Sequence, residues 1–366
     1  MKQTKGKIGI REFAAIMFLL IGTKITDDTP TYLYSGAKNA AWISMLLISM
    51  ALIIPTFLLL KVLSVHKGKN LHEINVYLFG KVIGNMVSLI LLIFGLVTIV
   101  LDSSVYVDII GTMYFTKTPN FAIFTVLMCV SAYGAKKGVE HIGSVAWLVF
   151  FYTKVTLIVA LLFTFKEGNS KLLFPILGPG VGGIVKTAAQ KLSIFGDFFY
   201  AGLIAPVIAT YKDFKRGVFL TYLILTVELT VALMLFVMLF DFTSVEILNY
   251  PFHETIRYIQ IGFLTNVETL FFPFWLVATF VRFSFYIYLF VLLLGGIFNI
   301  REFEYLIPLV TVIFIFLGIA PETPLVAISK NRELTLNVLS PLLFVLPCLM
   351  WLIAKVRGDF KNETSV

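Results

Sequence analysis

The sequence has few charged residues, cysteines and histidines, and each shortage excludes a class of protein. Only 14% of its 366 residues are charged, against roughly 25% in a soluble protein. The two cysteines lie inside apolar runs and give neither a disulfide framework nor metal-ligand spacing. The four histidines lie outside the centres of the apolar runs, and the sequence contains no phosphate-binding lysine motif. We therefore expect no enzyme, no metal and no other cofactor.

Apolar residues dominate the composition instead. They make up 59% of the chain, with 36 phenylalanines and a mean hydropathy of +0.94. A soluble fold has too little interior to hide that much apolar surface. Uncharged runs of 22 residues between Lys38 and Lys61, and of 21 between Glu333 and Lys355, match the roughly 20 residues that cross a bilayer as a helix. The pattern predicts an all-α membrane protein and excludes nucleic-acid-binding and disordered proteins.

Ten transmembrane helices are predicted in a single domain over residues 1–366, with no cleavable signal at the N-terminus. Ten crossings place both termini on one side. That side carries 17 Lys and Arg residues outside the membrane and the other carries 9, so we expect both termini in the cytoplasm. The ten helices are expected at 8–36, 39–62, 81–114, 119–136, 140–166, 191–211, 216–241, 263–298, 303–320 and 335–356.

Two of these helices contain polar interruptions. The first reads FLLIGTKITDDTPTY (18–32) and the sixth reads KLSIFGDFFYAGLIAP (191–206). Transporters built from inverted repeats place broken helices at matching positions of the two halves. The interruptions therefore favour two inverted repeats of five helices each, about 8–166 and 191–356. A His-Glu-x-x-x-Tyr string at 72–77 and again at 253–258 gives mild support, and both stretches are expected at the membrane surface, one on each side.

Two strings that suggest enzymatic sites lack the required context. The His-Glu-x-x-x-Tyr stretches lack the second histidine of a zinc protease. The glycines of Gly178–Gly183 match G-x-G-x-x-G, but no strand precedes them and a proline interrupts them. We interpret that segment as a turn before the sixth helix.

The polar residues inside the predicted helices are candidates for a ligand site. An unwound stretch at Gly22 and Thr23 would free N–H and C=O groups suited to a carboxylate and an ammonium; a simple glycine kink is the alternative. Gly196 and Asp197 hold the matching position of helix six, where Asp197 could pair with a ligand amine, with Lys24 or with water. Thr279 or Ser284 of helix eight could face the site. Arg282 and Glu228 are expected to form structural ion pairs.

Several segments resemble the spore germination permease family, the B subunits of nutrient germinant receptors in endospore-forming bacteria. The resemblance covers nearly the whole chain, although many members carry Glu where Asp197 stands. It is carried by the order and spacing of GTKI (22–25), NAAWIS (39–44), KLLFPILGPGVGGIVKTA (171–188), SIFGDFF (193–199), YPFHETIRYIQIGFLTNVETLF (250–271) and REFEYLIP (301–308).

The resemblance implies the LeuT-type fold of the amino acid–polyamine–organocation superfamily, with a nutrient ligand that is expected to be an amino acid. It places Thr98 and Asp102 of helix three beside the ligand. Lys154 of helix five is similar to the lysine that stands in place of sodium in proton-coupled relatives, where it would face helix-one carbonyls and Ser284. Snorkelling of Lys154 towards the cytoplasm is the alternative.

The implied partners are the membrane-bound A subunit and the lipoprotein C subunit of a germinant receptor, in the lipid of the spore inner membrane. No nucleic-acid partner is implied. A proton-coupled amino acid transporter shares every physical feature with the receptor subunit and stays open as an alternative function. A membrane scaffold without a ligand is disfavoured, because polar breaks inside a membrane are costly unless they serve a use.

Overall fold

The computed structural model describes residues 7–259, 267–319 and 325–360. Over these residues the chain is helical, joined by turns and loops, with one isolated bridge between Ile8 and Ile208. The prediction of an all-α protein is confirmed. The helices are α1 (Ile10–Gly22), α2 (Thr29–Ala37), α3 (Ala41–Val65), α4 (Leu71–Phe79), α5 (Lys81–Ile109), α6 (Asn120–Lys136), α7 (Val139–Glu167), α8 (Val181–Gln190), α9 (Asp197–Tyr200), α10 (Tyr211–Ile247), α11 (Pro251–Tyr258), α12 (Val267–Ile297), α13 (Ile307–Ile319) and α14 (Leu325–Arg357).

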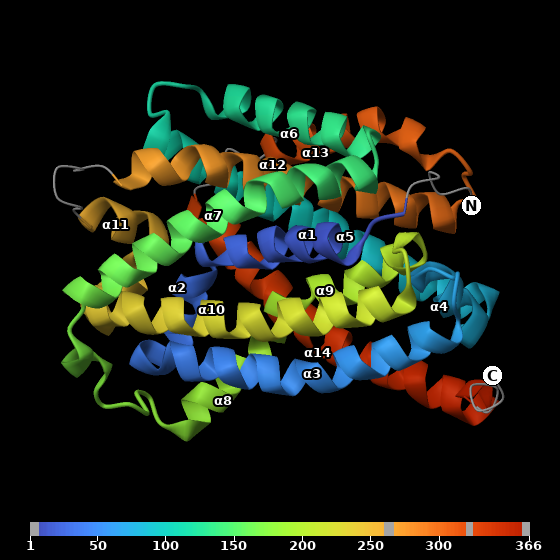
Figure 1. Ribbon diagram of the computed structural model, residues 1–366, viewed down its shortest axis with the longest axis horizontal. Coiled ribbons are helices and arrows are strands. Elements are labelled where there is room, and N and C mark those ends of the chain that lie inside the picture. Colours follow the sequence, from blue (N-terminus) through green and yellow to red (C-terminus); the bar gives the residue numbers. More distant parts are fainter. Residues whose placement is uncertain (1–6, 260–266, 320–324, 361–366) are drawn as a thin grey trace.

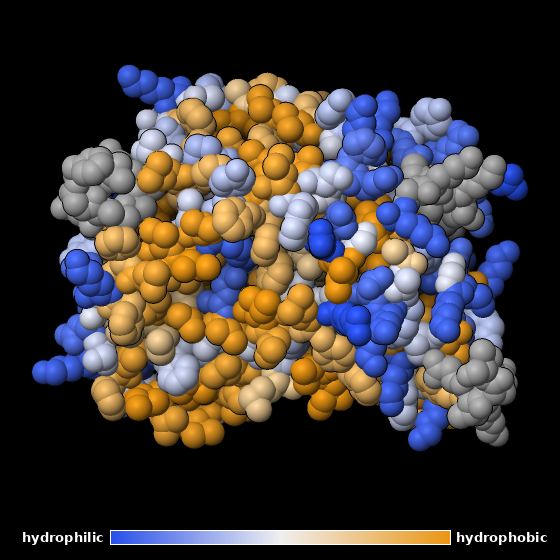
Figure 2. All heavy atoms as spheres, in the orientation of Figure 1, coloured by the Kyte–Doolittle hydropathy of each residue, from blue (hydrophilic) through white to orange (hydrophobic). Residues whose placement is uncertain are grey.

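The protein is a multi-pass membrane protein. Within the described part of the chain, six helical stretches are long and apolar enough to cross a bilayer, and three apolar helices are shorter. Large apolar side chains on α7, such as Leu148 and Phe151, are exposed, as expected of a surface solvated by lipid. Apolar residues spread across the middle of the face in Figure 2, and polar residues gather towards the two ends of the long axis.

Helix α1 forms the centre of the bundle (Figure 1). Every residue from Phe13 to Gly22 is buried, and α7, α10 and α12 pack around the helix. A helix that is apolar on all sides is stable only when it is surrounded in this way. Because α1 ends at Gly22, the first interruption of the chain lies inside the protein rather than against lipid.

Helix α14 crosses the bundle obliquely and packs on α3, α5 and α8 (Figure 1). It begins at Leu325, whereas the sequence predicted a start at residue 335. The earlier start brings the polar stretch Lys330–Glu333 into the helix.

The two short amphipathic helices lie at opposite ends of the molecule, α4 at one end and α11 at the other (Figure 1). The start of α1 and the end of α14 lie at the same end as α4. Helix α10 contains a non-helical residue, Asp241, at φ 60°, where the predicted helix 216–241 ends. The Asp241 carboxylate accepts hydrogen bonds from the amides of Thr243 and Ser244, so the helix starts again there.

Candidate ligand-binding site

The first interruption lies between α1 and α2. A 3-10 turn covers Thr23–Ile25, and the Thr26 hydroxyl donates to the Thr23 carbonyl at 2.6 Å. The Asp27 carboxylate accepts the amide of Thr29 at 2.8 Å. Pro30 lacks an N–H and suits the first turn of a helix, so the sequence TDDTP ends one helix and starts the next.

The second interruption lies between α8 and α10. A 3-10 turn at Leu192–Phe195 leads into the single turn α9, and a second 3-10 segment covers Ala201–Val207. Helix α14 supplies partners for the backbone here, because Ser340 Oγ accepts the amide of Ser193 at 3.0 Å. In return, the Ser193 hydroxyl donates to the carbonyl of Leu336 at 2.8 Å.

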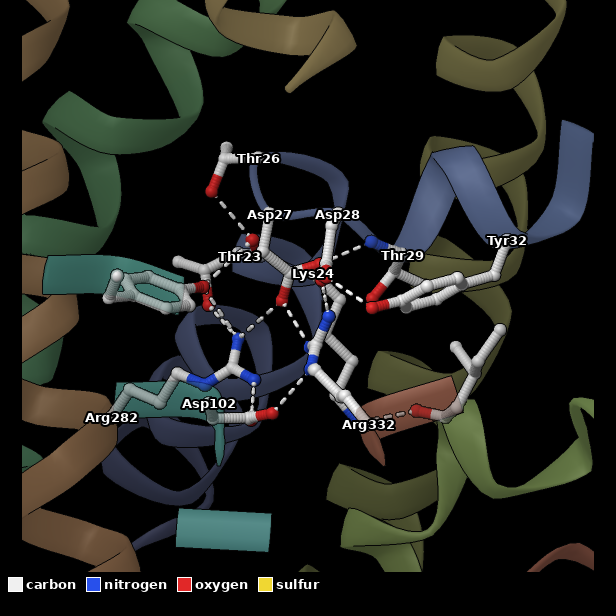
Figure 3. A network of polar contacts seen from close by, with 12 residues as sticks. Thr23, Lys24, Thr26, Asp27, Asp28, Thr29, Tyr32, Asp102, Arg282 and Arg332 are labelled. Atoms are coloured by element: carbon white, nitrogen blue, oxygen red, sulfur yellow. Dashed lines mark hydrogen bonds and ion pairs between the residues drawn. The ribbon is translucent and has the colours of Figure 1, made fainter. Parts of the chain in front are cut away.

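Two arginines and three aspartates meet at the first interruption (Figure 3). Arg282 of α12 donates to Asp102 of α5 at 2.6 Å. Arg332 of α14 donates to the other oxygen of Asp102 at 2.7 Å and to Asp27 at 2.7 Å. Arg332 also pairs with Asp28. All five side chains are buried, where an ion pair is tolerated only if hydrogen bonds satisfy its charged groups.

Neutral groups complete this network. Arg282 Nη1 donates to the hydroxyls of Thr23, at 2.9 Å, and Tyr106, at 2.7 Å. The Tyr106 hydroxyl donates to the Thr23 carbonyl at 3.0 Å. The carbonyl that the interruption leaves without a helical partner therefore accepts a hydrogen bond from a side chain of the protein itself.

An ion pair connects the two interruptions. Lys24 Nζ of the first lies 2.5 Å from Asp197 Oδ2 of the second and donates to the carbonyl of Ile194 at 2.6 Å. The other oxygen of Asp197 accepts the hydroxyl of Tyr286 at 2.7 Å. Lys24, one of the partners considered for Asp197 from the sequence, is therefore in contact with it.

A cavity of about 90 Å³ lies between the interruptions, large enough for several water molecules. Both members of the Lys24–Asp197 pair line it. Asp102 and Arg332 add charged groups to its wall, and α5, α12 and α14 add apolar ones. The apolar lining includes Leu91, Leu92, Ile99, Leu289, Leu293 and Leu336.

The structure brings four of the predicted site residues to this cavity: Thr98, Asp102, Gly196 and Asp197. Three others lie outside its lining. Thr23 joins the arginine network. The Thr279 hydroxyl donates to the Trp275 carbonyl within α12 at 2.9 Å. Gly22 packs elsewhere, since a Cβ added to it would lie 3.0 Å from Lys154 Nζ and 3.0 Å from Glu228 Oε1.

Lys154 and Ser284 make different contacts from those we expected. Lys154 Nζ donates to both oxygens of Glu228 of α10, at 2.5 and 2.6 Å, so its hydrogen-bond partner is a carboxylate rather than Ser284. The Ser284 hydroxyl donates to the Phe280 carbonyl of its own helix at 2.7 Å. The expected ion pairs of Arg282 and Glu228 are confirmed. Whether Lys154 replaces a cation functionally stays a prediction.

Arg332 is the residue that the sequence interpretation missed. The sequence placed it in the loop between the predicted helices 303–320 and 335–356. In the structure it is only 4% exposed and holds three aspartates. The signal available in the sequence was an unpaired excess of acid, Asp27 and Asp28, in the first helix, which requires a cation from another element.

A cluster of aromatic residues covers the first interruption on the side of α11. Trp275 Nε1 donates to Thr26 Oγ1 at 2.8 Å, and the ring of His253 packs edge-on against Trp275 with centroids 5.0 Å apart. His253 Nδ1 lies 2.9 Å from the hydroxyl of Tyr114. Burial, with a smaller effect of Arg257, lowers the pKa of His253 to about 3. His253 is therefore neutral at physiological pH.

Comparison with known proteins identifies the family. The family of spore germination proteins matches residues 12–324 of the chain, which include both interruptions. The protein belongs to this family. The resemblance drawn from the sequence motifs is thereby confirmed.

Three proteins of Bacillus subtilis (strain 168) are similar in sequence to this chain. Spore germination protein B2 is 20% identical over 252 residues, 68% of each chain. The putative spore germination protein YfkT is 25% identical over 278 residues, 74% of each chain. Spore germination protein KB is 26% identical over 188 residues, half of each chain.

Proposed function

We propose that this protein is the nutrient-sensing subunit of a spore germinant receptor and that the germinant binds in the cavity between the two interruptions. The observation that carries this proposal is the Lys24–Asp197 ion pair, which joins both interruptions on the wall of that cavity. Buried charges beside an open space are costly unless they serve a ligand. A ligand that contacts this pair changes how the two broken segments hold each other.

The lining suits a small amino acid. Lys24 and Arg332 offer donors to a carboxylate, and Asp102 and Asp197 offer acceptors to an ammonium. Leucines such as Leu289 and Leu336 offer an apolar wall to an aliphatic side chain. The charged residues would thus hold the carboxylate and ammonium of the ligand, and the leucines would contact its side chain.

The same proposal includes the architecture and the assembly. We assign the chain a LeuT-type fold of two inverted five-helix repeats with both termini in the cytoplasm. The interruptions at Gly22 and Gly196 and their central position support this assignment. We place the protein in the spore inner membrane with A and C subunits of the receptor, because a germination response has to pass from the ligand site to other proteins by a change in helix packing.

Two experiments test the function. Binding of the twenty protein amino acids, D-glucose and inosine to the purified protein by titration calorimetry should identify an amino acid as ligand. Spores that lack the gene should lose their response to that nutrient and keep their response to non-nutrient triggers. A deletion strain that germinates normally with every nutrient would contradict the receptor function.

Proton-coupled amino acid transport is the second candidate. The Lys154–Glu228 pair beside Gly22 favours it, because a buried ion pair in contact with a broken helix offers a site for a coupled proton. Proteoliposomes that contain the protein alone distinguish the two functions. Accumulation of a labelled amino acid, together with normal nutrient germination of the deletion strain, would favour the transporter.

A further inference from the structure

The end of α14 is fastened to α4, far from the cavity. Arg357 Nη1 donates to the Tyr77 carbonyl at 2.7 Å, and its guanidinium lies 5.4 Å from the centroid of the Tyr77 ring. Gly358 then turns the chain at φ 82°, a backbone conformation that glycine adopts at little cost. The turn brings Asp359 back to α4, where its Oδ1 accepts the hydroxyl of Tyr77 at 3.2 Å.

The second oxygen of Asp359 faces a histidine. Asp359 Oδ2 lies 3.2 Å from Nε2 of His66, the residue that follows α3, and the two side chains are only 11% and 6% exposed. Within the described part of the chain, no lysine or arginine nitrogen lies within 4 Å of this carboxylate. A carboxylate so far removed from solvent needs a positive partner, so the cation has to be His66.

The ring of His66 is held with both nitrogens towards oxygen acceptors. Nδ1 lies 2.9 Å from the Val62 carbonyl, which can only accept, so Nδ1 carries a hydrogen. A neutral imidazole has one N–H and one lone pair, and in this orientation the lone pair of Nε2 would face the Asp359 carboxylate. A second proton, on Nε2, converts this repulsion into an ion pair. The geometry therefore matches a charged His66.

We propose that His66 and Asp359 form a proton-dependent latch, which holds the end of α14 while His66 is protonated and releases it when His66 becomes neutral. On release the N–H bond at Nε2 breaks, its proton passes to solvent, and Asp359 keeps its negative charge. This inference is independent of the proposed ligand site.

Helix α14 contains the points at which a released end can bend. Pro341 and Pro347 lie inside the helix, between Arg332 and the latch. A proline removes one hydrogen bond of the helix and weakens it locally. The segment after Pro347 can therefore move when the latch opens, while Arg332 keeps its contacts with Asp27 and Asp102.

Other charged groups around His66 make the latch depend on Asp359. Lys69 and Arg357 both lie over the ring of Tyr77, which itself packs 4.9 Å from the ring of His66. These two cations oppose a charge on His66, whereas Asp359 favours it. Burial lowers the pKa of His72 of α4, so that histidine is neutral at neutral pH. The remaining charged groups on the elements packed here are Lys61 of α3, Lys67 of the following turn, Glu73 of α4, Lys81 of α5 and Lys355 of α14.

The proposal fixes the direction of the pH dependence. The closed latch holds a proton that the open, neutral form lacks, so the closing equilibrium weakens as the pH rises. It falls by up to about tenfold per pH unit while the open form is neutral and the closed form is protonated. Histidine charge changes typically fall between about pH 5 and 8, which makes pH 6 and pH 8 the informative pair of conditions.

The experiment is hydrogen exchange followed by mass spectrometry on the purified full-length protein in detergent at pH 6 and pH 8. After correction for the intrinsic pH dependence of amide exchange, residues 351–360 should be well protected at pH 6 and clearly less protected at pH 8. Peptides from the buried helix α1 (Ile10–Gly22) should keep their protection and serve as an internal control. Equal protection of residues 351–360 at the two pH values would overturn the proposal.

Two variants test the named residues. His66→Gln retains a polar side chain without a charge, and Asp359→Asn removes the charge of the partner, so each should show weak protection of residues 351–360 at both pH values. His141→Gln, an exposed histidine near the start of α7, should keep the pH dependence of the wild type. A dependence like that of the wild type in either latch variant would show that another group titrates, contrary to the proposal. If one latch variant fails to fold, the other and the wild type still decide the question.

Discussion

Lys24 and Asp197 lie 2.5 Å apart although 173 positions separate them in the chain. Each belongs to an interruption in an otherwise helical segment, and each lines the same cavity. The pair is buried, with side chains 10% and 7% exposed. It therefore holds the two broken segments together at the point where a ligand would enter between them.

Removal of one member of this pair should destabilise the protein. Lys24→Met leaves the Asp197 carboxylate buried without its cation, which costs about 3–5 kcal/mol. The double variant Lys24→Met with Asp197→Leu should recover most of that loss, because it removes both charges. Thermal unfolding in detergent measures both variants. A double variant no more stable than the single one would show that the pair is not the source of the effect.

Substitution of Gly22 should disturb a different ion pair. A Cβ at this position would lie 3.0 Å from both Lys154 Nζ and Glu228 Oε1, so Gly22→Ala is expected to cost about 1–3 kcal/mol. Gly22→Leu should force the pair apart and abolish the ligand response. Gly182→Ala serves as the control, since nothing lies within 4 Å of its Cβ position. A melting temperature of Gly22→Ala equal to that of the wild type would argue against this close packing.

The Lys154–Glu228 pair should not tolerate a bulkier cation. Lys154→Ala leaves Glu228 unpaired and is expected to weaken both stability and ligand response. Lys154→Arg should fail to restore them fully, because the planar guanidinium is larger than the ammonium that fits beside Gly22. Lys166→Arg, at the exposed end of the same helix, should behave like the wild type. Full activity of Lys154→Arg would contradict a compact site.

His253 should make the stability fall in acid. Burial lowers its pKa from 6.5 to about 3, so below pH 6.5 the unfolded chain binds a proton that the folded protein excludes. Stability is therefore lost as the pH falls from 6.5 towards 3, by up to about 1.4 kcal/mol per pH unit. His253→Gln should unfold at more similar temperatures at pH 5 and pH 7 than the wild type. An equal pH dependence in the two proteins would exclude His253 as the cause.

The helical architecture could be predicted because its causes are local. Charge-free runs such as the one between Lys38 and Lys61 mark helices directly, and α3 (Ala41–Val65) occupies that run. Glycine, aspartate and proline together at residues 22–30 mark a break, and α1 ends at Gly22. The inverted-repeat relationship of the two halves stays a prediction.

The ion pairs could not be predicted because they join distant segments. Arg332 is 305 positions from Asp27 and 230 from Asp102, and its polar neighbours in sequence indicate a loop. The partner of Lys154 depends on which face of α10 turns towards α7, which hydropathy does not determine. Gly196 and Asp197 were found because they lie at a break in the sequence, whereas Thr98 and Asp102 were found because the family resemblance placed helix three beside the ligand.

The central claim is that the germinant binds in the cavity between the two interruptions. The most direct test measures amino acid binding to a variant in which a larger side chain fills this cavity. Gly95 lines the cavity and has space at its Cβ position, with the ring of Phe290 3.9 Å away, so Gly95→Leu places a side chain in the cavity. Calorimetry with the identified amino acid should show binding to the wild type and to Gly182→Leu, and none to Gly95→Leu at comparable thermal stability. Unchanged affinity of Gly95→Leu would contradict the assignment of this cavity as the germinant site.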